Sequence, residues 1–337
     1  MLKKVNLFLL LLLTTFAKGQ DIHFSQFFNA PQNCNPALSC LFNGDYRFVA
    51  NYENQWRTIP VPYRTNAIAA DAKLPIKLKK DIIGAGILLV NDKAGDGAFV
   101  SNQLGLSLSY IKKLNADSTS FLSIGIQPAL VSKSFNLSKL SFDNQFSDGT
   151  YNSAIASGEN FSATKIQYFD LAAGLNFLQK FGTHSSAQLG FGYAHFQKQN
   201  ISFLNDKSSV THPKYLAHAT FVFGVNDGLE LIPTGLFEQQ NKNREIVAGV
   251  LARFILENKA DRLRAFSIGG LMRLKDAFVV DAQIDYNQFR LGMSYDVNFS
   301  NLKKASNGLG GFEFSLIYIV KRFVRVNASK VICPVFL

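Results

Sequence analysis

The chain has 337 residues and a formal net charge of +11, and 47% of its residues are hydrophobic. This length suits one large barrel or two ordinary domains. A net positive charge indicates nucleic acid, anionic lipid or an acidic protein as partner. The export signal described next disfavours nucleic acid. The basic residues are spread among expected turns, apart from one cluster at Lys73, Lys77, Lys79 and Lys80.

The first residues have the organisation of a secretory signal peptide. Lys3 and Lys4 give a positive start, an apolar run over 5–13 follows, and Ala17-Lys18-Gly19 supplies the small residues of a cleavage site. The run is about half the roughly 20 residues that a spanning helix needs, which disfavours a membrane anchor. We therefore expect residues 1–19 to be removed. No later run is long enough for a spanning helix, so any insertion into a membrane must use strands.

The three cysteines leave the disulfide state open. They are Cys34, Cys40 and Cys333, and export permits a disulfide. An odd number leaves at least one thiol free or paired between chains. A disulfide could join Cys34 and Cys40, which are close in the sequence. A disulfide between Cys333 and either of them is equally compatible with the sequence. No His–Cys cluster has metal-binding spacing, so we expect no metal site.

Alternation of apolar and polar residues predicts strands throughout the rest of the chain. The clearest example runs from Phe289 to Phe299, where every second residue is apolar and the residues between are polar or glycine. Fourteen segments follow this pattern, many of them as long as the roughly 9–11 residues that a tilted membrane strand needs. The predicted strands cover 44–55, 63–73, 82–91, 100–111, 120–131, 166–178, 185–197, 214–225, 229–238, 245–256, 264–274, 277–286, 289–299 and 311–321.

Strand length, aromatic residues near strand ends and a polar opposing face favour a transmembrane antiparallel β-barrel over a soluble β-sandwich. The fold class is therefore all-β, with a barrel of about 14 strands over 44–321 in the outer membrane. An even number of strands places both termini on the periplasmic side. We expect 20–43 to be a periplasmic N-terminal segment and 322–337 a periplasmic C-terminal tail. The longest connections, 132–165 and 198–213, follow odd-numbered strands, as outer loops would.

Catalytic residues are not apparent in the sequence. No Gly-x-Ser-x-Gly elbow is present, and the five histidines, among them His195, have no nucleophile or paired acids at a recognisable spacing. We expect the histidines to have interfacial or lumen polar roles. The interpretation is a non-enzymatic protein without a cofactor. The alternative is a diffusion channel or solute transporter with Asp281, Asp285 and Asp296 lining its lumen.

Several residues are candidate contacts for a protein partner. Asp92 and Asp96 lie in a loop that resembles a calcium loop but has Gln103 where the closing acid belongs, so a shaped outer turn is favoured. Trp56 ends the first predicted strand, where a membrane-belt role is favoured over a partner contact. Mixed aromatic and acidic residues in the longest outer loop suit protein contact or a packed lid, namely Phe142, Phe146 and Asp148.

Short motifs along the chain resemble the PorP/SprF family of the type IX secretion and gliding machinery. They cover nearly the whole chain after the signal peptide, in the family's order. Two departures are Cys40, where family members usually have glycine, and Val335, where they usually have a basic residue. The motifs are Gln20-Asp21, Phe24-Ser25-Gln26, Asn35-Pro36-Ala37, Asp45-Tyr46-Arg47, Asn51-Tyr52, Asn54-Gln55-Trp56, Pro62-Tyr63, Thr65, Asn91 to Gly97, Phe169-Asp170, Gly174, Arg273, Asp276-Ala277, Leu291-Gly292, Ser294-Tyr295-Asp296, Ser300-Asn301-Leu302, Ala305-Ser306, Cys333-Pro334 and Phe336.

The resemblance implies an outer-membrane barrel that supports secretion or cell-surface anchoring of cargo proteins. Its implied partners are type IX secretion components, such as a periplasmic ring or a peptidoglycan-binding lipoprotein, and the C-terminal domain of a secreted cargo or gliding adhesin. Outer loops could hold the cargo. The periplasmic segments could contact the other components, with Asn35 and Pro36 as candidate contacts.

Overall fold

A computed structural model describes residues 21–55, 63–76, 81–95, 98–147, 149–259, 262–300 and 309–321. The predicted signal peptide (1–19), the predicted tail (322–337) and Cys333 lie outside these residues.

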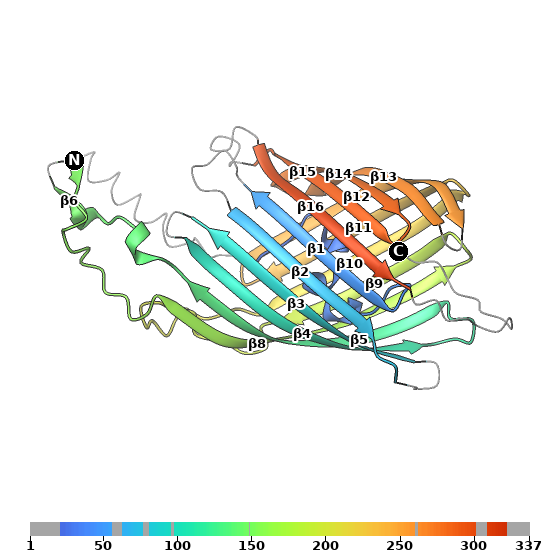
Figure 1. Ribbon diagram of the computed structural model, residues 1–337, viewed down its shortest axis with the longest axis horizontal. Helices are drawn as coiled ribbons and strands as arrows, with labels where there is room; N and C mark the ends of the chain where they lie inside the picture. The colour runs from blue at the N-terminus through green and yellow to red at the C-terminus, as the bar shows by residue number, and fades with distance from the viewer. Residues whose placement is uncertain are drawn as a thin grey trace.

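Fourteen antiparallel strands close into one barrel (Figure 1). Each strand pairs with its neighbour along the chain, and pairing of the first strand with the last closes the sheet. All fourteen predicted strands are confirmed. They are β1 (Tyr46–Gln55), β2 (Tyr63–Lys73), β3 (Ile82–Ala94), β4 (Phe99–Lys113), β5 (Ser120–Ser134), β8 (Lys165–Phe181), β9 (Ser185–Ala194), β10 (Lys214–Asn226), β11 (Leu229–Gln240), β12 (Asn243–Lys259), β13 (Arg262–Arg273), β14 (Ala277–Tyr286), β15 (Phe289–Asn298) and β16 (Leu309–Val320).

Alternation along each strand separates an apolar outer face from an inner face. In β14, exposure alternates residue by residue: Ile284 is 56% exposed, whereas Asp281 is fully buried. In a soluble protein such exposed apolar side chains would be costly, but facing lipid they are stabilised. No helix among the described residues is long and apolar enough to cross a membrane.

The two ends of the barrel differ in the length of their connections. We call the end of the barrel where β1 begins, at Tyr46, and β16 ends, at Val320, the terminal end. The connections 182–184, 227–228 and 287–288 at this end are short turns. The opposite end, the loop end, carries connections 135–164 and 195–213. The longer of these contains the short strands β6 (Phe146–Ser147) and β7 (Thr150–Tyr151) and projects far beyond the barrel (Figure 1). Outer-membrane barrels have short periplasmic turns, so we expect the terminal end to face the periplasm.

Residues 21–43, which we call the plug, lie inside the barrel. This corrects our expectation of a periplasmic segment outside the barrel. The plug contains η2 (Phe27–Asn29), α2 (Pro31–Cys34) and η3 (Pro36–Leu38). Most of its side chains are buried against inward-facing residues of the wall. The physical reason is that short helices cannot satisfy their own polar groups, whereas the lumen supplies partners for them.

Candidate functional site

A carboxylate of the barrel wall holds the first anchor of the plug. The backbone N–H groups of Ser25 and Gln26 donate to the two carboxylate oxygens of Glu313 at 2.6 and 2.9 Å. Hydrogen bonds to a charged acceptor are stronger than neutral ones. The Gln26 amide also donates to Ser294 Oγ at 3.1 Å. Glu313 therefore fixes the turn that leads into η2.

Arg273 compensates the negative charge around this anchor. Its guanidinium lies 3.0 Å from Asp296 Oδ2 and 3.5 Å from Glu245 Oε1. It also donates a hydrogen bond to Ser25 Oγ, whose own hydroxyl donates to the Asp296 carboxylate. Removing one partner from such a buried network leaves an uncompensated charge, which is strongly destabilising. Arg273 thus joins the plug to strands β12, β13 and β15.

Asn35 forms the second anchor, in the middle of the lumen. Its Nδ2 donates to the backbone carbonyls of Leu175 and Phe191 at 3.1 and 3.3 Å. Its Oδ1 accepts the N–H of Ala37 at 2.9 Å, which caps the start of η3. The side chain lies directly over Gly174, where a Cβ would overlap Oδ1. Position 174 therefore has to be glycine for Asn35 to reach the wall.

Other inward-facing glycines accommodate the plug in the same way. A Cβ added at any of them would come closer than 3 Å to a plug atom, a separation that real Cβ contacts essentially never show. The missing side chains let the plug approach the wall backbone closely. The pairs are Gly292 with Gln26 and Asn29, Gly86 with Gln32, Gly125 with Pro36, and Gly84 with Cys40.

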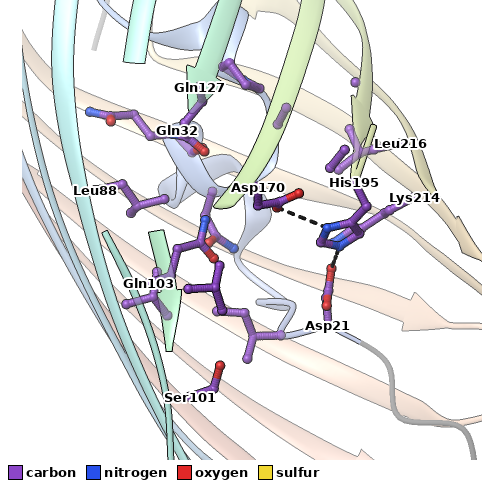
Figure 2. A pocket seen from close by; sticks show the side chains of 18 of the residues that line it. Asp21, Gln32, Leu88, Ser101, Gln103, Gln127, Asp170, His195, Lys214 and Leu216 are labelled. Atoms are coloured by element: carbon purple, nitrogen blue, oxygen red, sulfur yellow. Dashed lines mark hydrogen bonds and ion pairs between the residues drawn. The ribbon is translucent and has the colours of Figure 1, made fainter. Parts of the chain in front are cut away.

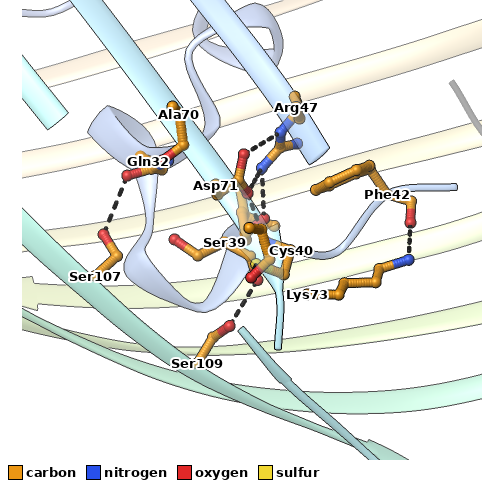
Figure 3. A network of polar contacts seen from close by, with 12 residues as sticks. Gln32, Ser39, Cys40, Phe42, Arg47, Ala70, Asp71, Lys73, Ser107 and Ser109 are labelled. Atoms are coloured by element: carbon orange, nitrogen blue, oxygen red, sulfur yellow. Dashed lines mark hydrogen bonds and ion pairs between the residues drawn. The ribbon is translucent and has the colours of Figure 1, made fainter. Parts of the chain in front are cut away.

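The third anchor ties the last turn of the plug to β1 and β2 (Figure 3). Arg47 binds Asp71 through two nitrogens, at 3.0 and 2.6 Å, and also donates to the carbonyl of Leu38 at 3.0 Å. Asp71 accepts the N–H of Cys40 at 2.5 Å. Cys40 has φ 63°, in the left-handed region that favours glycine. A glycine at this position would adopt the same φ without strain.

The two described cysteines, Cys34 and Cys40, are free thiols and not bonded to each other. Burial, together with the nearby Asp71, raises the pKa of Cys40 to about 12. Burial also raises the pKa of Cys34 well above its usual range. Both thiols are therefore protonated and unreactive while the plug is in place.

A polar cavity of about 170 Å³ lies between the plug and the loop end (Figure 2). Its main feature is His195, whose Nε2 lies 2.6 Å from Asp21 and whose Nδ1 lies 3.0 Å from Asp170. Burial alone would lower the pKa of His195, but the two carboxylates outweigh it and raise the pKa to about 9. The imidazolium is therefore charged at neutral pH and holds the start of the plug.

A cluster of packed aromatic rings lies at the loop end. Phe203, from connection 195–213, lies edge-on to Phe135 and Phe99 with ring centroids 4.9 and 6.1 Å apart. Its carbonyl accepts the N–H groups of Ser162 and Ala163 at 3.0 and 3.3 Å. These contacts hold the two long connections together. We call this group the loop cluster.

Beyond the loop cluster, the β6–β7 hairpin exposes two aromatic side chains. Phe146 and Tyr151 are 52% and 46% exposed, and their ring centroids are 5.6 Å apart. Exposed aromatic rings on an ordered support are typical of protein contacts. Phe142 instead turns toward Phe161, with ring centroids 6.3 Å apart, which makes it part of the support.

The structure separates the predicted contact residues into different regions. Asn35 and Pro36 are buried in the lumen, so they contact the barrel wall. Asp92 accepts a hydrogen bond from Thr65 Oγ1 at 2.8 Å and lines the polar cavity. Phe142 and Phe146 lie in the long connection of the loop end, as expected. Trp56, Asp96 and Asp148 lie outside the described residues.

Sequence reasoning missed Glu313, Asp71 and the role of the inward glycines. An available signal was the occurrence of Gly174 and Gly292 within strands, since glycine in a strand marks a close approach of another backbone. The direction of the His195 side chain was also not predictable from the sequence, because the alternation of β9 would direct this side chain outward. A left-handed φ of 59° breaks that alternation, and the ring turns toward Asp170.

The family model of the type IX secretion system membrane protein PorP/SprF matches residues 16–318. The chain belongs to the PorP/SprF family. This PorP/SprF protein is accordingly an outer-membrane β-barrel of a type IX secretion system.

Solved structures similar to this PorP/SprF protein are outer-membrane barrels of low sequence identity. The Ralstonia pickettii toluene transporter TbuX has 10% identity and a TM-score of 0.49, covering 86% of this chain and 92% of that one. A Pseudomonas aeruginosa FadL homologue has 11% identity and a TM-score of 0.47, covering 84% and 92%. BamA from Haemophilus ducreyi lacking POTRA domains 1–3 has 10% identity and a TM-score of 0.44, covering 82% and 70%. A search of curated proteins gave no significant match.

Proposed function

We propose that this protein is a non-enzymatic component that supports secretion or cell-surface anchoring of cargo, with the loop end holding the cargo's C-terminal domain. The observation that carries the proposal is that the barrel lumen is filled while the loop end presents exposed aromatic side chains. The lumen is occupied by a plug with three buried anchors, while the opposite end presents Phe146 and Tyr151 on the ordered loop cluster. A barrel whose lumen is filled in this way is better suited to binding a protein at its end than to passing solutes through its lumen.

The terminal end provides the second contact surface in this proposal. It faces the periplasm, where a ring component or a peptidoglycan-binding lipoprotein would meet the short turns and the tail 322–337. Family membership implies contact with other secretion components. Asn35 and Pro36 are excluded from this contact as long as the plug is seated, because both are buried.

Substitution of the exposed hairpin rings tests the proposal in cells. Phe146→Ser combined with Tyr151→Ser removes the apolar contact area but leaves the loop cluster untouched. We expect cargo to appear in the medium while the barrel still inserts. Leu137→Ser is the matched control, because Leu137 is 37% exposed in the same connection but lies outside the hairpin. Cargo that stays on the cell surface in the double variant would contradict the proposal.

A gated channel is the second candidate, and one observation favours it. Cavities of about 170 and 420 Å³ lie on the two sides of the plug, so displacement of residues 21–43 would join them into a continuous path. The anchors oppose this displacement. Purified protein in a planar bilayer distinguishes the two functions, because a steady conductance of the wild-type protein favours the channel.

A further inference from the structure

The outer face of the barrel carries polar and basic side chains near the loop end, on strands β2, β3, β4, β5 and β8. These five strands are consecutive neighbours in the sheet (Figure 1). Side chains that lie directly opposite each other on paired strands share one face of the sheet. The register therefore aligns the outward-facing side chains into rows across the five strands, and three of these rows follow one another toward the loop end.

The row farthest from the loop end is apolar. Its side chains are well exposed on the outer face, with Ile68 at 59% and Leu130 at 61%. This row therefore belongs to the apolar band that a transmembrane barrel presents to lipid. Its members are Ile68, Leu89, Leu104, Leu130 and Phe169.

The next row toward the loop end consists of four amides and one hydroxyl. Asn91 Nδ2 donates to Asn102 Oδ1 at 2.7 Å, which joins β3 to β4 on the outer face. An amide group both donates and accepts hydrogen bonds, so the row suits a ligand with several hydroxyl groups. Its members are Asn66, Asn91, Asn102, Ser132 and Gln167.

The third row, closest to the loop end, adds positive charge. Arg64 is directly opposite Lys93, Lys165 ends the row on β8, and all three side chains are exposed. Val100 and Ser134 lie between Lys93 and Lys165. The two lysines are thus three strand spacings apart, which is roughly 14 Å at about 4.8 Å for each spacing. The row provides two separated cationic positions, and none of its five members is acidic.

A groove of about 500 Å³ lies where the apolar row and the amide row meet. Its volume is within the roughly 300–1,000 Å³ of small-molecule sites. Hydrocarbon would be stabilised along its apolar side, and hydrogen-bonding groups would be stabilised along its amide side. The groove therefore suits the junction between the acyl chains and the headgroup of a lipid. Its outward-facing lining residues are Asn66, Ile68, Leu89, Asn91, Asn102, Leu104, Leu130, Ser132 and Gln167.

The neighbouring strands β9 and β10 have a different outer face at the loop end. Tyr193 is directly opposite Tyr215, and their ring centroids are 5.1 Å apart. Phe196 packs edge-on against Tyr193 at 4.6 Å. Aromatic side chains of this kind form the usual girdle at the membrane interface. On β2 to β8 amides and cations take the place of this girdle, which distinguishes the region from an ordinary contact with lipid.

We infer that these three rows form a site for a phosphorylated glycolipid of the membrane leaflet at the loop end. One phosphate pairs with Arg64 and Lys93 and a second with Lys165, because basic side chains form strong hydrogen bonds with phosphate oxygens. The sugar hydroxyls meet the amide row, and the acyl chains lie along the apolar row. Charge complementarity selects an anionic headgroup. The separation of the two cationic positions favours a broad headgroup with two phosphates over a single glycerol phosphate.

Native mass spectrometry of the full chain in an uncharged detergent tests this inference, with lipid A as the probe. Lipid A is a disaccharide that carries two phosphates and several acyl chains. We expect it to bind at least tenfold more tightly than its dephosphorylated form and than phosphatidylglycerol. Equal binding of the dephosphorylated form would overturn the role of the cations, and equal binding of phosphatidylglycerol would overturn the glycolipid. The test needs no cargo, so the inference goes beyond the proposed function and does not depend on it.

Substitution of the three exposed cations tests the position of the site. Arg64→Gln, Lys93→Gln and Lys165→Gln together should weaken binding of lipid A at least tenfold, and exposed substitutions of this kind have small effects on folding. Arg244→Gln is the matched control, because Arg244 is exposed near the loop end on β12, outside the three rows. Equal weakening by the control would show an unspecific positive belt and contradict the site.

A second variant tests the groove without changing any charge. Leu104→Trp narrows the groove and should also weaken binding of lipid A, whereas unchanged binding would contradict the position of the acyl chains. Inorganic phosphate is the last competitor. Displacement of lipid A by phosphate alone would show a site for free anions and contradict the lipid.

Discussion

The side chain of Asn35 occupies the space that any side chain at position 174 would fill. The two residues are far apart in the sequence. Their contact joins η3 of the plug to β8 at the centre of the lumen. It explains why a glycine is placed in a long strand, where it otherwise weakens packing.

Gly174→Ala should unseat the plug. The added methyl group overlaps Asn35 Oδ1, and overpacking of this kind costs typically about 1–3 kcal/mol. The control is Gly192→Ala, because Gly192 is directly opposite Gly174 and a Cβ there meets its nearest atom at an ordinary 3.6 Å. Urea unfolding in lipid vesicles, followed by circular dichroism, should show the loss for position 174 only. Equal stability of both variants would contradict the seating of Asn35.

Thiol labelling reports whether the plug is in place. With Cys333→Ser as background, Cys34 and Cys40 should react very slowly with maleimide at pH 7.5, because burial raises the pKa of both thiols. Gly174→Ala should accelerate labelling of both by at least tenfold, whereas Gly192→Ala should not. Rapid labelling of Cys34 and Cys40 in the Cys333→Ser background would mean that the plug leaves the lumen freely.

Attachment of the plug's first residues should depend on pH through His195. The pKa of this imidazole is about 9 in the folded protein and 6.5 as its ordinary value. A raised pKa contributes stability that is complete below the ordinary pKa and is lost as pH rises through the folded one. The contribution, up to about 3 kcal/mol by the size of the shift, should therefore disappear between pH 6.5 and 9.

The measurement for this pH effect is unfolding free energy against pH for the wild type and His195→Gln. The groups around the ring are Asp21 and Asp170 in contact and the more distant Lys214 and Lys133. Glutamine does not titrate, so the His195→Gln variant should lack the decline seen in the wild type. An identical decline in both proteins would place the titrating group elsewhere.

The seated plug should keep the barrel closed to ions. Wild-type protein in a planar bilayer should show no steady conductance, because the three anchors hold residues 21–43 in the lumen. Gly174→Ala should show openings, and Gly192→Ala should behave as wild type. Steady conductance of the wild type would favour the channel alternative over a closed scaffold.

The barrel was predictable because each strand carries its own signal. Apolar and polar residues alternate in β14 and β15 with the period of the structure they form, so all fourteen strands could be identified from local sequence. Their number and the parity of the long connections then indicated which end carries the loops.

The plug was not predictable from local sequence. Residues 21–43 lack periodicity, since each side chain is placed by a different partner in the wall, for example Asn35 by Gly174 and Cys40 by Asp71. Such contacts join residues far apart in the chain. The inward direction of the His195 side chain was not predictable from the alternation of β9, because the left-handed backbone at this residue reverses the direction of its side chain.

Affinity purification of the tagged protein from gently solubilised outer membranes is the decisive test of the proposed role in cargo anchoring. We expect type IX secretion subunits to be recovered together with one exported surface protein, and only the surface protein to be lost in the Phe146→Ser, Tyr151→Ser variant. Recovery of the barrel without any secretion subunit or exported protein would contradict it.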